Sequence, residues 1–110
     1  HNDPTAHAEV SAIRAACESV GDFSLTGSVI YSTCEPCPMC LSAIWWARID
    51  AIYYASTRDD AAKIGFDDAA LYEEVSLAIH DRRLPLRRCA IKEADELMNK
   101  WLNKKNKVPY

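Results

Sequence analysis

The sequence lacks a long apolar run, a signal-peptide pattern and an excess of positive charge. No apolar stretch approaches the roughly 18 to 20 residues that a bilayer-spanning helix needs, and no charged, apolar and small-residue succession opens the chain. Thirteen Lys and Arg face sixteen Asp and Glu, which gives a net charge of −3. Nucleic-acid and membrane-surface proteins normally carry a large basic excess. We therefore expect a cytoplasmic protein with a small-molecule substrate, no membrane association and no nucleic-acid partner.

The composition that is present is that of an ordinary globular domain. Hydrophobic residues make up 49% of the 110 residues and charged residues 26%. This length is close to the commonest size of a single domain, and the sequence contains neither internal repeats nor low-complexity linkers. Residues 1–110 are therefore expected to form one domain with its own core.

The five cysteines are odd in number and clustered, which argues against a closed disulfide framework. Three of them lie in "CEPCPMC", residues 34–40, where two overlapping C-x-x-C pairs are possible. Such clustering is typical of a metal site in a reducing compartment. Either pair, Cys34 and Cys37 or Cys37 and Cys40, could supply the sulfurs.

Helical and strand patterns alternate along the chain. Thr5 can cap a first helix that Gly21 ends. Strands separated by helices imply a parallel sheet covered on both sides. The expected elements after the first helix are a strand over Gly27–Thr33, a helix from Pro38 to Arg48, a strand over Asp50–Ser56, two short helices with a turn at Gly65 within 57–74, a strand over 85–92 and a helix over 93–105.

His7 and Glu9 lie two residues apart near the start of the first helix. On a regular helix this spacing separates side chains by roughly 200°, so both can serve one point only beyond the helix end. Cys37 and Cys40 begin the other helix, where the dipole and free amide groups favour thiolate. Cys34, at a strand end, lacks that help. We therefore expect His7, Cys37 and Cys40 to bind one metal ion between two helix N-termini.

The full pattern, "HAE" followed by "PCPMC", matches the signature of the zinc nucleobase deaminases. In that signature Glu9 is the catalytic acid and base, and three protein ligands to Zn²⁺ leave the fourth tetrahedral position for water. The alternative is a closed structural site with Cys34 as fourth ligand, which would leave Glu9 unexplained. Glu35 is interpreted as a helix-start carboxylate that organises the loop.

Across nearly its whole length the chain resembles bacterial guanine deaminases of the cytidine deaminase superfamily. The stretches "NDPTAHAEV", "STCEPCPMC", "AIWWAR" and "IGFDD", with a short tail ending in tyrosine, carry this resemblance. It implies a three-layer α/β/α sandwich, of which the N-terminal helix and first two strands are expected to be missing from this chain. It also implies substrate contacts by Ala8, Asp68 and Tyr110, one Zn²⁺ per subunit, and a homodimer with an exchanged C-terminal segment.

The expected function is hydrolytic deamination of guanine to xanthine and ammonia. Alternatives are a tRNA adenosine deaminase, a cytosine or nucleoside deaminase, and a catalytically silent zinc-binding domain. The first two share the metal-binding stretches, so discrimination depends on "GFDD" and the tail. Guanine offers N–H donors that a buried carboxylate at Asp68 could accept, although aspartate is also common at helix starts.

Overall fold

The computed structural model describes residues 2–110, which form two compact units, one up to Leu77 and the other from Ala78 to Tyr110. A single deaminase domain spanning residues 1–110 stays a prediction.

The first unit alternates helices and strands, as the sequence predicts. Two strands pair in parallel, with Val29 opposite Ala51 at one end and Cys34 opposite Ser56 at the other. The elements are α1 (Ala8–Val20), β1 (Val29–Cys34), α2 (Pro38–Trp46), β2 (Ala51–Ser56), α3 (Arg58–Lys63) and α4 (Ala69–Ser76).

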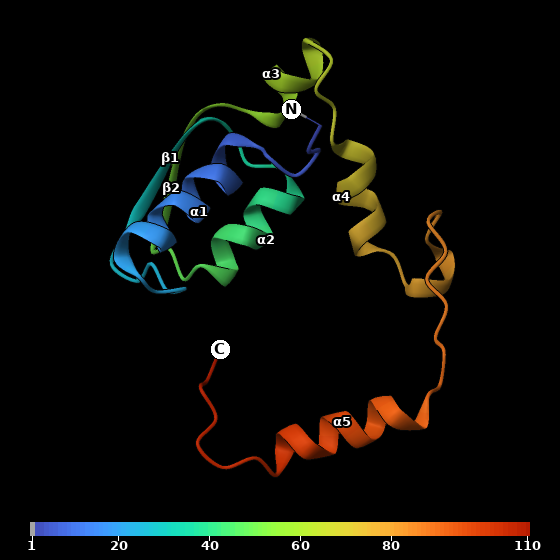
Figure 1. Ribbon diagram of the computed structural model, residues 1–110. Coiled ribbons are helices and arrows are strands. Elements are labelled where there is room, and N and C mark those ends of the chain that lie inside the picture. Colours follow the sequence, from blue (N-terminus) through green and yellow to red (C-terminus); the bar gives the residue numbers. More distant parts are fainter. Residues whose placement is uncertain (1) are drawn as a thin grey trace. The chain divides into compact units, whose positions relative to one another are not determined.

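Helices α1 and α2 lie side by side on one face of this sheet (Figure 1). Burial alternates along β1 in agreement with this arrangement. Ile30 and Ser32 are half-buried, whereas Val29 and Tyr31 are exposed. On the opposite face Tyr31 stacks on Tyr53 with ring centroids 5.3 Å apart, and Tyr31 remains 76% exposed.

The predicted three-layer fold has helices on both faces of its sheet, and within residues 2–110 the helices α1 and α2 cover one of these faces. The reason lies in the connections. A helix comes to cover a sheet face when it crosses over to a further parallel strand. Within residues 2–110, β1 and β2 are the strands of the sheet, so the chain after β2 makes no such crossover.

Two helix boundaries follow from local chemistry, and one predicted cap is wrong. Gly21 ends α1 in the left-handed region at φ 70°, and its N–H donates to the carbonyl of Cys17. Pro38 opens α2, where its fixed φ suits the first turn. Thr5 does not cap α1, because its N–H and hydroxyl both donate to Asp3 Oδ1, at 2.8 and 2.6 Å. His7 occupies the N-cap position instead.

The second unit contains a short 3₁₀ helix, Ile79–Asp81, and α5, Lys92–Leu102. The strand predicted over 85–92 does not form, although Ile91 has extended dihedrals. An extended segment becomes a strand only when a neighbour accepts its backbone hydrogen bonds, and these residues are exposed. A local sequence pattern does not show whether a neighbouring strand is present to pair with the segment.

The most buried apolar side chains are Leu25, Cys40, Ile44 and Ala47, three of which belong to α2 or its end. The core is thus formed largely by the buried side of α2, the helix that carries Cys40. Burial of these side chains holds that helix in place. Among the described residues, no helix is both long and apolar enough to cross a bilayer.

Candidate active site

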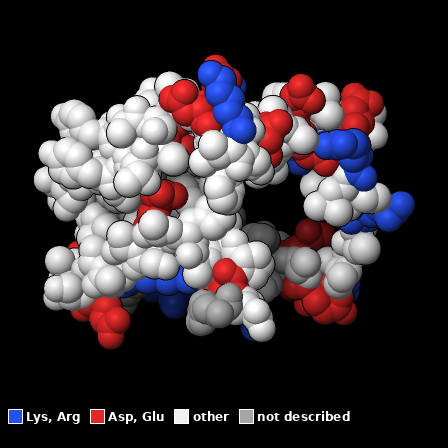
Figure 2. All heavy atoms as spheres, turned by 90° about the horizontal axis from the view of Figure 1, so that it is seen from above, with Lys and Arg blue, Asp and Glu red and all other residues white. Residues whose placement is uncertain are grey.

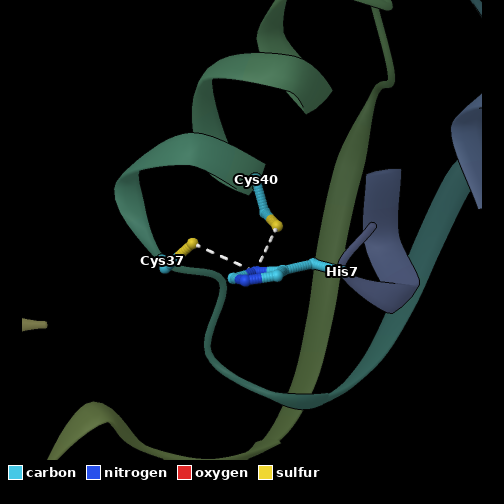
Figure 3. Close-up of side chains that lie close together, drawn as sticks. All are labelled: His7, Cys37 and Cys40. Atoms are coloured by element: carbon cyan, nitrogen blue, oxygen red, sulfur yellow. Dashed lines mark hydrogen bonds between the residues drawn. The ribbon is translucent and has the colours of Figure 1, made fainter. Parts of the chain in front are cut away.

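Two helix starts present the three expected metal ligands to one point. His7 is the N-cap of α1 and Cys37 the N-cap of α2, both with extended dihedrals, and neither side chain makes a capping hydrogen bond. Cys40 lies one turn into α2. Figure 3 shows the imidazole of His7 reaching under α2 with both sulfurs directed toward it. The spacing argument for a point beyond the helix ends is consistent with this geometry.

The interatomic distances fit a tetrahedral zinc ion. His7 Nδ1 lies 3.6 Å from Cys37 Sγ and 3.4 Å from Cys40 Sγ, and the three ligand atoms all lie within 4.8 Å of one another. Zn–N bonds of about 2.0 to 2.1 Å and Zn–S bonds of about 2.3 Å, at a tetrahedral angle, place nitrogen and sulfur about 3.6 Å apart. The residues present therefore fit Zn²⁺, a metal that takes nitrogen and sulfur ligands.

The three ligands differ in exposure. Cys40 is fully buried, Cys37 half-buried and His7 exposed. Burial raises the pKa of the Cys40 thiol well above its usual range, and hydrogen bonding with Glu9 and the neighbouring Cys37 raise it further. Without a metal this thiol is therefore neutral, and a cation bound beside it would have to displace its proton.

Glu9 lies beside this group of ligands and is held by a residue that the sequence did not single out. The hydroxyl of Ser32, in β1, donates to Glu9 Oε1 at 2.9 Å. Glu9 is half-buried in the first turn of α1. The only signal for Ser32 was its place at an inward-facing position of an alternating strand. Together these contacts direct a carboxylate toward the metal ligands from the helix that carries His7.

Cys34 lies outside the group. It is half-buried at the end of β1, and the ligand group found among the described residues contains His7, Cys37 and Cys40 without it. This placement supports Cys37 and Cys40, and not Cys34 and Cys37, as the pair that supplies the sulfurs.

We predict that Cys34→Ala keeps one Zn²⁺ per chain and most of the activity, because the nitrogen and two sulfurs at the site are unchanged. Metal content by atomic absorption and ammonia release measure the two effects. The matched change Cys37→Ala should lose the metal. Loss of zinc from the Cys34 variant would favour the closed structural site.

The three residues predicted to contact substrate have different surroundings. Ala8 is the exposed first residue of α1, next to His7. Asp68 is the half-buried N-cap of α4, yet its side chain makes no capping hydrogen bond. The adjacent Asp67 does that work, accepting from the N–H of Ala69 at 2.9 Å. Tyr110 belongs to the other unit and is 70% exposed there. The roles of these three residues stay predictions.

Glu35 serves a helix start, although at α3 rather than at α2. Its Oε1 accepts from the backbone N–H of Arg58, the first residue of α3, at 3.1 Å. Its own N–H donates to the carbonyl of Ser56 at 2.7 Å. The loop before Cys37 is thus attached to the end of β2 and to the helix that follows it.

On the face shown in Figure 2, acidic and basic side chains lie next to one another beside a broad area of uncharged atoms. This mixture agrees with the net charge of −3. It is the charge pattern of a protein whose substrate need not be a polyanion.

Taken together, the site has one nitrogen and two sulfur ligands with a carboxylate beside them. No fourth His, Cys, Asp or Glu joins the group within residues 2–110. Structural zinc sites normally have four protein ligands, whereas catalytic sites have three and keep one position open. The fold and the site therefore define a zinc hydrolase of the α/β class.

The chain belongs to the cytidine and deoxycytidylate deaminase family. Residues 1–56 match the zinc-binding region of that family. The chain is 46% identical to guanine deaminase of Bacillus subtilis over 109 residues, which cover 99% of this chain and 70% of that protein. It superposes on a crystal structure of that guanine deaminase with a TM-score of 0.93, covering 99% of this chain and 69% of the other.

Similarity to tRNA-specific adenosine deaminases is confined to a part of the chain. The protein of that name from Agrobacterium fabrum is 53% identical over 55 residues, which are 50% of this chain and 36% of that protein. The predicted fold class and Zn²⁺ as cofactor are confirmed by the family and by the structural match.

Proposed function

We propose that this chain catalyses the zinc-dependent hydrolytic deamination of guanine, giving xanthine and ammonia. The observation that carries the proposal is the group of His7, Cys37 and Cys40 with Glu9 beside it, because this arrangement leaves a position open for chemistry. The choice of guanine is supported by the similarity to the Bacillus subtilis enzyme, which extends past the zinc-binding region to 99% of the chain.

In this reaction Zn²⁺ would be held by His7 Nδ1 and the two thiolates, and it lowers the pKa of water from 15.7 to about 7. Glu9 accepts a proton from the attacking water and delivers it to a ring nitrogen. It then takes the proton of the hydroxyl now bonded to the reacting carbon and delivers it to the amine, which leaves as ammonia. Ser32 keeps one oxygen of this carboxylate in place through its hydrogen bond. Burial of Cys40 excludes water from the inner side of the site.

Asp68 is proposed to select guanine. The purine presents N–H donors at N1 and at its exocyclic amine, and a half-buried carboxylate accepts both. Since the side chain of Asp68 makes no capping hydrogen bond, it remains available for this contact. Tyr110 and the backbone at Ala8 are proposed to complete the substrate contacts.

The function is tested by measuring ammonia release from guanine, with cytosine, adenosine and a tRNA as parallel substrates of the zinc-loaded protein. Release from guanine alone supports the proposal. Release from tRNA alone would favour the adenosine deaminase alternative, and silence on all four with zinc bound would favour a silent zinc-binding domain.

Asp68→Ala is predicted to lower kcat/KM for guanine by roughly 10- to 150-fold, as expected for losing hydrogen bonds of about 1.5 to 3 kcal/mol to a charged acceptor. Steady-state kinetics measure the change. Asp67→Ala is the matched control, since it removes the side chain that does cap α4. If the two variants had the same kcat/KM for guanine, Asp68 would be a helix-start residue without a role in substrate binding.

A homodimer with an exchanged C-terminal segment and a cytoplasmic location are also proposed. The dimer is supported by α5, where Leu97, Met98, Trp101 and Leu102 are all more than half exposed. An apolar helix face of this kind normally packs against another surface.

A further inference from the structure

The loop that precedes Cys37 is connected to α3 and α4 by three side chains, Glu35, Arg58 and Tyr72, which we name the brace. Besides the hydrogen bond from the Arg58 backbone, Arg58 Nε lies 3.9 Å from Glu35 Oε2. The Arg58 guanidinium carbon lies 4.0 Å from the centre of the Tyr72 ring. The Tyr72 hydroxyl then donates to the carbonyl of Pro36 at 3.0 Å. The contacts form a closed circuit that returns to the residue next to Glu35.

The surroundings of the brace favour a fixed geometry. Pro36 is buried, and the three side chains of the brace are half-buried. Burial raises the pKa of Tyr72, although Arg58 opposes the shift, so the phenol stays protonated and keeps its role as donor. Removing the hydroxyl would leave the Pro36 carbonyl without this partner in a buried position.

The two ends of the brace carry different parts of the site. Glu35 and Pro36 lead directly into Cys37, a metal ligand. Tyr72 lies one helical turn after Asp68, and its N–H donates to the Asp68 carbonyl at 3.1 Å. Between α3 and α4 the chain passes through exposed residues, Ile64 to Asp67. The start of α4 is therefore tied to the metal-binding loop through Tyr72 and Arg58.

We propose that Glu35, Arg58 and Tyr72 are positioning residues for the substrate, because they hold Asp68 at a set place relative to the metal ligands. The inference rests on the proposed function in taking Asp68 as the purine contact. A residue that acts through Asp68 affects binding more than the chemical step, so its loss raises KM and leaves kcat nearly unchanged.

The test is Tyr72→Phe, which deletes the hydroxyl and retains the ring under Arg58. The zinc-loaded variant should show a KM for guanine raised several-fold, with kcat within about twofold and the zinc content unchanged. Glu35→Gln, which keeps the side chain's shape, should act in the same direction. Tyr31→Phe, the same change on the exposed face of the sheet, should have no effect.

A double-mutant comparison separates positioning from a general loss of stability. In an Asp68→Ala background, Tyr72→Phe should cause no further rise in KM, because the residue it positions is absent. The same factor in both backgrounds would overturn the proposal, as would a fall in kcat with unchanged KM.

A readout that does not need guanine turnover keeps the two proposals apart. Hydrogen exchange of the zinc-loaded protein should show faster exchange of the α4 amides in Tyr72→Phe, with α1 amides unchanged. Faster exchange in a protein that is silent on guanine would retain the brace and reject the proposed function. Unchanged exchange in α4 would overturn the brace whatever the substrate is.

Discussion

Glu9→Ala should keep zinc and lose turnover, with kcat lower by about 10² to 10⁴, the usual contribution of a general acid and base. The carboxylate is the group placed to move protons between water, ring nitrogen and leaving amine, and it is not among the expected metal ligands. Zinc content and the rate of ammonia release at saturating guanine measure the two effects.

Glu18→Ala is the matched control for this variant. Glu18 lies on the same helix but is exposed at its far end, so both zinc and kcat should be unchanged. Glu9→Gln should resemble Glu9→Ala, because an amide can still accept from Ser32 but cannot take a proton. Normal activity in either Glu9 variant would remove Glu9 from the acid and base role.

Cys40→Ala should weaken zinc binding by at least about 100-fold and abolish ammonia release. Changes to residues that only support metal ligands already cost 10- to 100-fold in affinity, so loss of a ligand costs more. Competition with a chromophoric chelator measures the affinity. Cys89→Ala, an exposed cysteine of the second unit, should bind zinc as the unaltered protein does.

The affinity of the unaltered protein should also rise with pH. Its raised pKa leaves the Cys40 thiol protonated near neutrality, and zinc must displace that proton. Raising the pH removes protons that compete with the metal, so binding tightens. Calorimetry in buffers of different ionisation enthalpy counts the protons that zinc binding releases. If Cys40→Ala bound zinc with the full affinity of the unaltered protein, the metal ligands would not include Cys40.

The group of three expected metal ligands could be predicted because its members lie in two local motifs, which the deaminase signature joins although 30 positions separate His7 from Cys37. His7 with Glu9, and Cys37 with Cys40, lie at two helix starts that Pro38 and the apolar periodicity already mark. The contacts of Ser32 with Glu9 and of Tyr72 with Pro36 could not be predicted, since they join residues 23 and 36 positions apart. Nothing in a strand or helix pattern specifies such pairs.

The strand predicted over 85–92 failed for a related reason. A local residue pattern indicates that a segment suits extended backbone, but pairing depends on a neighbour elsewhere in space. Thr5 shows the same limit at short range. Threonine is a residue type that often caps helices. In this structure the N–H and hydroxyl of Thr5 instead donate to the carboxylate of Asp3, so Thr5 belongs to a turn before the helix.

The two helices that meet at the site both begin without a side-chain cap. A Ser, Thr, Asn or Asp at an N-cap stabilises a helix by roughly 1 kcal/mol relative to residues that cannot cap. His7 and Cys37 occupy those positions with side chains directed to the metal site instead. Positions 7 and 37 are therefore where folding stability and activity compete. Substitutions there that make the metal-free protein more stable, such as His7→Asp, would do so by removing the ligands on which activity depends.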